Sequence, residues 1–134
     1  MKKYFLTFIA LFFVSFLATA QSTETTKSPS KVTAVVFHAD WCPYCTKLSD
    51  KIESIKADID ISDVEFIRFD FTDKDTKEAT QAFAAANSVM SVLENHKGTG
   101  FLVLIDSETK EELVKIGAKD SKEKIKASFE KYLN

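Results

Sequence analysis

Two short runs of uninterrupted apolar residues constrain the fold of this chain more than any other feature of its sequence. Residues 34–37 read Ala-Val-Val-Phe, and residues 101–105 read Phe-Leu-Val-Leu-Ile. Runs of this length that are rich in β-branched and aromatic residues are typical of β-strands covered on both faces. The chain must therefore supply a covering layer on each side of a sheet, which favours an α/β fold.

Two other stretches have the periodicity of amphipathic helices. From Pro43 on, apolar residues recur at spacings of four, three and four, with charged residues between them. These apolar positions are Leu48, Ile52, Ile55 and Ile59. A last helix is expected to begin with Asp120 as its N-cap and Glu123 at the third position. Its inner side should consist of Ile125, Phe129 and Leu133.

A further helix is expected in the middle of the chain. Thr72 is its predicted N-cap, since a carboxylate, Asp75, follows three residues later. Its buried residues should be Ala79, Phe83 and Ala86. After an interruption at Asn87 and Ser88, apolar residues recur at helical spacing from Val89, which predicts a short extra helix up to Asn95.

The remaining segments complete the order β-α-β-α-β-β-α. A second strand is expected at residues 64–71 and a fourth at 111–116, after a turn at 106–110 rich in Asp, Ser and Thr. The strand-helix-strand start implies parallel pairing with a right-handed crossover, and the turn implies an antiparallel hairpin. The sequence therefore predicts a mixed four-stranded sheet with helices on both faces.

The first 20 residues have the pattern of a secretory signal peptide. Two lysines precede an apolar run from Tyr4 to Leu17, and a small-x-small cleavage site ends at Ala20. The run is shorter than the roughly 20 residues that a membrane span requires. We therefore expect a polar linker at residues 21–31 and one domain at residues 32–134, exported to the periplasm or secreted.

The charge of the chain excludes two classes of function. The sequence has 18 Lys and Arg against 20 Asp and Glu, and cleavage after Ala20 would remove two of the lysines and no acidic residue, leaving a net charge of −4. A nucleic-acid binder would show a basic patch, and a peripheral membrane anchor a polybasic segment. We therefore expect neither nucleic-acid binding nor membrane attachment after cleavage.

The only two cysteines, Cys42 and Cys45, lie where the first strand ends and the first helix begins. A bridge over so short a loop stabilises little, so the pair is better suited to chemistry than to structure. Unpaired N–H groups and the helix dipole favour a thiolate at the N-cap, which predicts a lowered pKa for Cys42. We expect Cys42 to attack disulfides and Cys45, less exposed, to resolve the mixed disulfide.

The segment around these cysteines resembles a known family. Residues 39–45 read Ala-Asp-Trp-Cys-Pro-Tyr-Cys and follow Val-Val-Phe, as in the active-site region of the thioredoxin superfamily. Asp70-Phe71-Thr72 and the run from Phe101 to Asp106 resemble the periplasmic, C-terminal thioredoxin-like domain of disulfide-interchange reductases. The resemblance implies a thioredoxin-like three-layer sandwich and disulfide exchange with exported proteins, without an organic cofactor because the cysteine pair carries the electrons.

The resemblance also implies the substrate-binding residues. Trp41 flanks the substrate surface, and Pro43 and Tyr44, the pair found in glutaredoxins, separate the cysteines. Thr99 and Gly100 occupy the place of a cis-proline that in the family faces the cysteines and helps to bind the substrate backbone. The expected partners are protein thiols and disulfides and a membrane reductase or oxidase, and the protein is expected to be a monomer.

Three further departures from the family are visible. Val36 stands where thioredoxins often have a buried aspartate, so another group must accept the proton of Cys45. Residues 89–98 are longer than the family connection and are expected to form a lid or rim beside the active site. The family's N-terminal strand and helix are missing or reduced to the linker.

The histidines leave an alternative function open. His38, with Asp40, lies just before the cysteines and as a cation would lower the pKa of the thiolate further. As a neutral imidazole, His38 could instead bind a metal together with Cys42 and Cys45, which would suit a periplasmic metal carrier. A third alternative is an inert adaptor whose cysteines stay oxidised. We favour the oxidoreductase, with no metal at the site, and expect His96 to be exposed.

Overall fold

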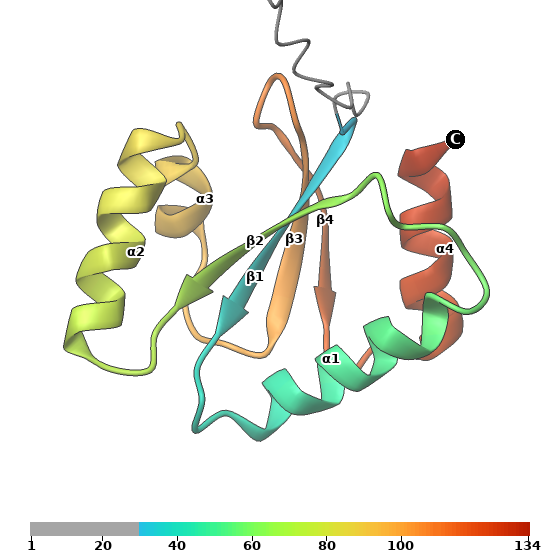
Figure 1. The fold of residues 1–134 in the computed structure, drawn as a ribbon, viewed down its shortest axis with the longest axis horizontal. Coiled ribbons are helices and arrows are strands. Elements are labelled where there is room, and N and C mark those ends of the chain that lie inside the picture. The colour runs from blue at the N-terminus through green and yellow to red at the C-terminus, as the bar shows by residue number, and fades with distance from the viewer. Residues whose placement is uncertain (1–29) are drawn as a thin grey trace, which may run out of the picture.

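The computed structural model describes residues 30–134, so the predicted signal peptide and most of the predicted linker lie outside the described residues. The helices and strands follow one another in the predicted order, and the short extra helix is present (Figure 1). The elements are β1 (Val32–His38), α1 (Pro43–Ile55), β2 (Glu65–Asp70), α2 (Lys74–Ala86), α3 (Met90–Asn95), β3 (Phe101–Asp106), β4 (Glu112–Gly117) and α4 (Lys122–Leu133).

The four strands form one mixed sheet in the order β2-β1-β3-β4. β1 runs parallel to β2 and antiparallel to β3, which pairs antiparallel with β4. The two central strands are those with the uninterrupted apolar runs, because only there are both faces covered. The predicted α/β class with a mixed four-stranded sheet is confirmed.

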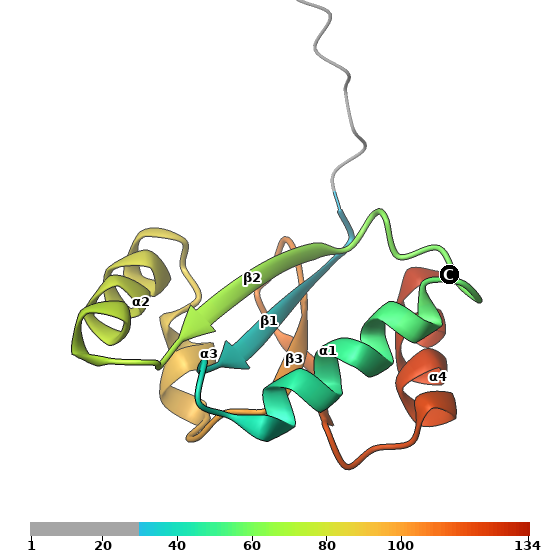
Figure 2. The same cartoon turned by 60° about the horizontal axis from the view of Figure 1, so that its bottom comes forward.

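Helices cover both faces of this sheet. α1 and α4 lie on one face and α2 and α3 on the other, as two views of the ribbon show (Figures 1 and 2). The core beneath α1 and α4 is mainly aliphatic, and the predicted residues Leu48, Ile52, Ile55, Ile125 and Phe129 are buried in it. The core beneath α2 and α3 is built around three aromatic rings, those of Phe37, Phe69 and Phe101.

The buried side of α2 differs from the prediction. Ala79 and Ala86 are exposed and Phe83 is 42% exposed, whereas Thr80 and Ala84 are buried. The Thr80 hydroxyl accepts the N–H of Asp70 (2.9 Å) and donates to the carbonyl of the same residue (3.0 Å) at the end of β2. These two hydrogen bonds offset the cost of burying a hydroxyl. The buried side of α2 therefore lies one residue later than predicted, with Thr80 in place of Ala79 and Ala84 in place of Phe83.

Two helices have their N-caps one residue later than predicted. Asp73, rather than Thr72, caps α2, and it exchanges hydrogen bonds with Thr76 in a capping box. Ser121, rather than Asp120, caps α4. In both cases the predicted residue has another partner: the Thr72 hydroxyl donates to the carboxylate at the end of β2, and Asp120 accepts a backbone N–H at the end of β4. Two adjacent polar residues thus indicate in the sequence where a helix begins, but not which of the two is its N-cap.

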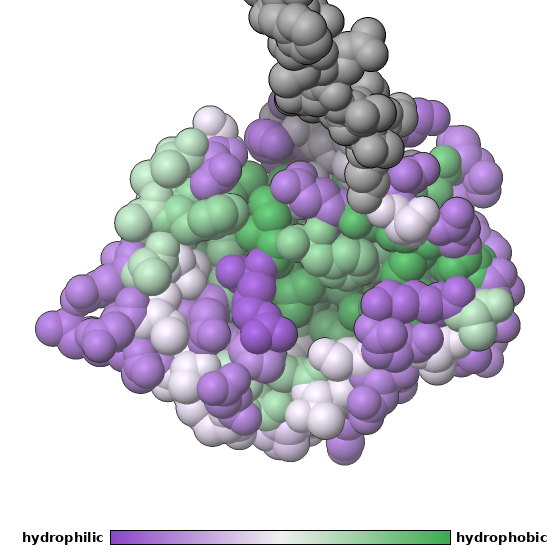
Figure 3. All heavy atoms as spheres, viewed as in Figure 1, coloured by the Kyte–Doolittle hydropathy of each residue, from purple (hydrophilic) through white to green (hydrophobic). Residues whose placement is uncertain are grey.

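The edge strand β2 is the least covered part of the sheet. Phe66 on this strand is 42% exposed, whereas Phe69 is buried. In the space-filling view, apolar surface gathers over the middle of the molecule and hydrophilic side chains lie around it (Figure 3). No helix within residues 30–134 combines the length and apolar character needed to cross a membrane.

Candidate active site

Both cysteines lie at the junction of β1 and α1, as the sequence predicts. Cys42 is the N-cap of α1, with extended backbone, and Pro43 is the first helical residue, where a missing N–H costs nothing. The N–H of Cys45 donates to the sulfur of Cys42 over 3.3 Å. The sulfur of Cys42 therefore takes the place of the oxygen that usually caps a helix, and the orphan amides of the first turn point at it.

The two thiols are driven apart in pKa. Burial raises the pKa of Cys42, but hydrogen bonds from the side chains of Cys45 and Thr99 and from the backbone N–H groups of Cys45 and Tyr44 outweigh it, so the net pKa is lowered. Burial raises the pKa of Cys45, and its hydrogen bond to Cys42 and the charge there raise it further. Of the two thiols, Cys42 therefore ionises more readily and Cys45 less readily than an unperturbed cysteine.

The surroundings of Cys45 differ from the prediction in one respect. Cys45 was expected to be the less exposed cysteine, yet both residues are 4% exposed and both thiols are free. The pair packs against Ala39 and Phe71. The sequence has no buried aspartate to accept the proton of Cys45. In the structure the Cys45 thiol donates a hydrogen bond to the backbone carbonyl of Phe37 over 3.7 Å. Hydrogen bonding, rather than exposure, distinguishes the two sulfurs.

The loop before β3 closes on the cysteine pair. Gly100 has a φ of +85°, and a Cβ added there would lie 2.6 Å from the Cβ of Tyr44 and 3.5 Å from the sulfur of Cys42. Its N–H donates to the carbonyl of Phe37 at 2.9 Å. Both the backbone conformation and the close approach require glycine. The predicted residues Thr99 and Gly100 therefore do lie against the cysteines.

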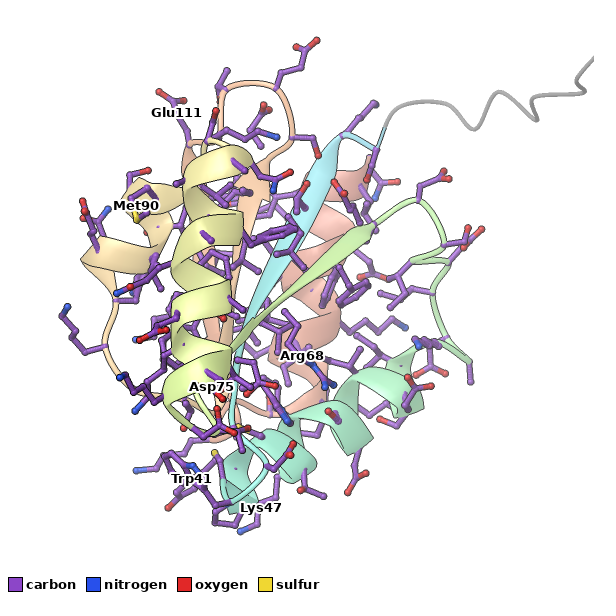
Figure 4. The ribbon with its side chains drawn as sticks, turned by 60° about the vertical axis from the view of Figure 1, so that its left-hand side comes forward. Trp41, Lys47, Arg68, Asp75, Met90 and Glu111 are labelled. Atoms are coloured by element: carbon purple, nitrogen blue, oxygen red, sulfur yellow. The ribbon has the colours of Figure 1, made fainter. Side chains whose placement is uncertain are left out.

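Two exposed aromatic rings flank the pair. Trp41 is 65% exposed, and its Nε1–H donates to the carbonyl of Thr72 over 3.0 Å, which ties it to the start of α2 (Figure 4). Tyr44 is 46% exposed, and the ammonium groups of Lys47 and Lys119 lie 5.5 and 5.9 Å from the centre of its ring. Sequence reasoning missed both lysines. Lys47 follows Tyr44 by three residues on α1, so the helical pattern could have indicated it, whereas no local pattern indicates that Lys119 of the β4–α4 loop reaches this ring.

His38 joins a group of carboxylates rather than the cysteines. Its Nε2 lies 3.0 Å from Oδ1 of Asp40, and Asp70 completes a set of ligand atoms within 4.8 Å of one another. Hydrogen bonds from the side chain and N–H of Thr72 hold the pKa of Asp70 below its usual range, although burial opposes them. Within residues 30–134 this is the one such group of His, Cys, Asp and Glu. The geometry does not support the alternative of a metal held by Cys42, Cys45 and His38.

The prediction that His96 is exposed is wrong. Its side chain is 14% exposed, and its Nε2 lies 2.8 Å from the carboxylate of Glu112 on β4. Its ring packs against those of Phe37 and Phe101, with centroids 5.7 Å away in each case. Burial raises the pKa of Glu112, but hydrogen bonds from His96 and Asn95 outweigh it and lower the pKa. The imidazole can be largely buried because its Nε2 has a hydrogen-bond partner in the carboxylate of Glu112. This contact holds the loop that carries Thr99 against β4.

Comparisons with known proteins agree with this architecture. A family model described as a thioredoxin-like domain matches residues 19–132. No curated protein matches the chain significantly. The chain is similar to the crystal structure of Trxlp from Edwardsiella tarda, with 17% identity, a TM-score of 0.52, and coverage of 73% of this chain and 81% of that one.

Two further solved structures have a similar fold. One is described as a DsbH oxidoreductase, with 19% identity, a TM-score of 0.50, and coverage of 75% of this chain and 74% of that one. The other is a thioredoxin from Malassezia sympodialis, with 19% identity, a TM-score of 0.50, and coverage of 78% and 80%. At such identities the likeness establishes the fold.

Proposed function

This chain belongs to the thioredoxin-like domain family, and on that premise we propose that it is a thiol–disulfide oxidoreductase in which Cys42 is the nucleophile and Cys45 the resolving thiol. The observation that carries the proposal is the place of Cys42 as the N-cap of α1, where its sulfur accepts the N–H of Cys45. This placement lowers the pKa of Cys42, whereas that of Cys45 is raised. A sulfur held as thiolate by helix amides, next to a thiol that keeps its proton, is the arrangement that disulfide exchange requires.

The exchange proceeds in two balanced steps. The Cys42 thiolate attacks one sulfur of a substrate disulfide, so that a mixed disulfide forms and the other substrate sulfur leaves as a thiolate. Cys45 then gives its proton to the substrate thiolate released in the first step, attacks the sulfur of Cys42, and releases the second substrate sulfur as a thiolate. The substrate gains two electrons and the pair becomes a disulfide; with an oxidised pair and a reduced substrate the same steps run in reverse.

The proposed substrates are disulfides and thiols of exported proteins. The exposed rings of Trp41 and Tyr44 beside the sulfur offer a surface for a polypeptide, since aromatic residues are enriched at protein interfaces. The signal-peptide pattern of residues 1–20 supports a periplasmic or secreted location. There we propose a monomer that needs no organic cofactor and is recycled by a membrane reductase or oxidase.

Alkylation of the reduced protein at different pH values tests the assignment of roles. Because the pKa of Cys42 is lowered and that of Cys45 raised, the Cys45→Ser variant should react with iodoacetamide at a lower pH than free cysteine. The Cys42→Ser variant should react only at a higher pH. Equal pH profiles for the two variants would contradict the roles, and insulin reduction that survives Cys42→Ser would remove the proposed activity.

The lowered pKa also predicts the redox balance of the pair. Because the pKa of Cys42 is lowered, its thiolate stabilises the reduced form of the pair. This stabilisation is fully present at a pH above the pKa of a free thiol, and it is lost as the pH falls through the lowered pKa of Cys42. Thr99→Val removes one hydrogen bond to the sulfur and should raise that pKa and make the pair less oxidising. Equilibration with glutathione at several pH values measures the change; an unchanged equilibrium would show that Thr99 does not stabilise the thiolate.

A further inference from the structure

An open groove of about 520 Å³ lies between α2, α3 and the loop that leads to β3. Three partly buried apolar side chains, Phe71, Met90 and Leu93, line it and rest on the aromatic core of this face. Lys77 on α2 and Lys97 in the loop lie at its rim. The exchange steps above use none of these residues, so the groove is apolar surface without an assigned role.

The groove is continuous with the cysteine pair through two segments. Phe71 lines the groove and also packs against the cluster formed by Ala39, Cys42 and Cys45. Gly98 lines the groove as well, and the next residue, Thr99, hydrogen-bonds to the sulfur of Cys42. Figure 4 shows Met90 on α3 beside α2, and Trp41 at the lower end of the molecule, below the start of α2 near Asp75. A chain bound at the sulfur can therefore continue into the groove.

The rim of the groove carries unpaired charge. Within residues 30–134, neither the Lys77 nor the Lys97 ammonium group forms an ion pair, and both residues are exposed. One carboxylate, that of Glu94, also lines the groove, which leaves an excess of one positive charge. An apolar floor with a positive rim favours an occupant that is itself apolar with a negative charge beside it.

The length of the groove sets the size of the occupant. Its wall α3 has six residues and is about 9 Å long at a rise of 1.5 Å per residue. An extended polypeptide covers that length with about three residues. The segment 89–98, which was expected to be a lid or rim, thus forms one wall of a site that fits a short stretch of chain.

We propose, as a consequence of the oxidoreductase function, that this groove binds the segment of the substrate polypeptide next to its reactive cysteine, and that it selects an apolar residue accompanied by acidic ones. The apolar side chain packs on Phe71, Met90 and Leu93, and the carboxylates face Lys77 and Lys97. The groove therefore determines which disulfides reach Cys42 in a productive orientation.

Peptide disulfides test this selection. Two peptides are made, each with a single cysteine and a leucine near it. They differ only in the two residues beside the leucine, which are aspartates in one peptide and lysines in the other. The cysteine of each peptide is joined to 2-mercaptoethanol by a disulfide. The reduced protein should consume the acidic peptide about three- to tenfold faster, the range expected for exposed charge pairs. Replacing the leucine of the acidic peptide with serine should slow its reaction.

Charge reversal in the protein locates the effect. The double variant Lys77→Glu/Lys97→Glu should abolish or invert the preference, whereas Lys74→Glu, at an exposed position on α2 outside the groove, should preserve it. Thermal unfolding of each variant shows whether it is folded. Equal rates for the two peptides, or a preference that survives the double variant or disappears with Lys74→Glu, would overturn the proposal.

Two more measurements separate this proposal from the function on which it rests. Reduction of 2-hydroxyethyl disulfide, a small neutral substrate, reports the exchange chemistry alone. Fluorescence anisotropy with labelled peptides whose cysteine is replaced by serine reports binding alone. If the protein carries out exchange but does not discriminate between the peptides, only the groove proposal is overturned. If it binds the acidic peptide but carries out no exchange, the groove proposal is supported and the oxidoreductase function is overturned. If it neither binds the peptides nor discriminates between them, the groove proposal is overturned.

Discussion

The two faces of the sheet differ in what they contribute to this protein. The face covered by α1 and α4 is a core of mainly aliphatic side chains. Five of the residues predicted from helical periodicity are buried in it, whereas Ile59, beyond the end of α1, and Leu133 are only partly buried. The face covered by α2 and α3 has an aromatic core, a buried hydroxyl at Thr80 and a partly buried imidazole, that of His96, which contacts the carboxylate of Glu112. The first face is held by apolar packing, whereas the second combines apolar packing with buried or partly buried polar groups next to the loop that contacts the cysteines.

The difference follows from the kind of contact on each face. Apolar packing depends on area and is tolerant of small shifts, so an amphipathic helix finds its orientation from its own sequence. A buried polar group needs a partner at hydrogen-bond distance, and that partner comes from a distant part of the chain. These hydrogen bonds can therefore hold the loop and the groove of the second face in defined positions beside the cysteines. Because the groove is open, less apolar surface is buried there.

The largest expected effect contrasts one phenylalanine on each face. Phe129→Ala on α4 removes a fully buried ring and should lower the free energy of unfolding by about 3–5 kcal/mol. Phe83→Ala on α2, where the ring is 42% exposed, should cost less than about 1 kcal/mol. Urea denaturation of both variants measures the difference, and equal losses would show that the two faces do not differ as described.

The next effect tests the contact between the loop and the cysteine pair. Gly100→Ala combines a positive φ with a Cβ placed 2.6 Å from Tyr44, and should destabilise the protein by about 2–4 kcal/mol. Gly98→Ala is the matched control, because its φ is also positive, at +93°, but the space around it is open. It should cost about 1 kcal/mol. If thermal unfolding gave the same loss for both, backbone conformation alone would explain Gly100.

The smallest effect concerns the buried hydroxyl. Thr80→Val keeps the shape of the side chain but removes both hydrogen bonds to the backbone of Asp70, and should cost about 1–2 kcal/mol. Thr76→Val on the same helix also removes two hydrogen bonds, those between its hydroxyl and the backbone of Asp73, but they are exposed and should cost less because water can replace them. A neutral Thr80→Val in denaturant titrations would mean that α2 is held by apolar contacts alone.

Much of the fold was predictable because it rests on local signals. The two apolar runs identified the central strands, and the spacing of Leu48, Ile52 and Ile55 identified the buried side of α1. The polar residues before α2 and α4 marked helix starts to within one residue. Each of these signals lies within one or two turns of the element that it describes, so no knowledge of distant contacts was needed.

The site was predictable only in part. The placement of Cys42 at a helix N-terminus, and hence its lowered pKa, follows from the strand-to-helix junction alone. The low exposure of His96 does not follow from local sequence, because its partner Glu112 and the two rings around it come from three different strands. The role of Phe71 as the residue shared by the cysteine cluster and the groove has no sequence signal either, since nothing local distinguishes it from Phe69.

The amino-acid sequence by itself determined that a cysteine pair would stand at the start of a helix on an α/β sheet, because strand patterns and helix capping act between near neighbours in the chain. Only the tertiary structure decided what surrounds the pair: Gly100 against Tyr44, Thr99 on the sulfur, and a groove behind Phe71. These contacts join residues far apart in sequence, so they exist only once packing has fixed the position of every layer.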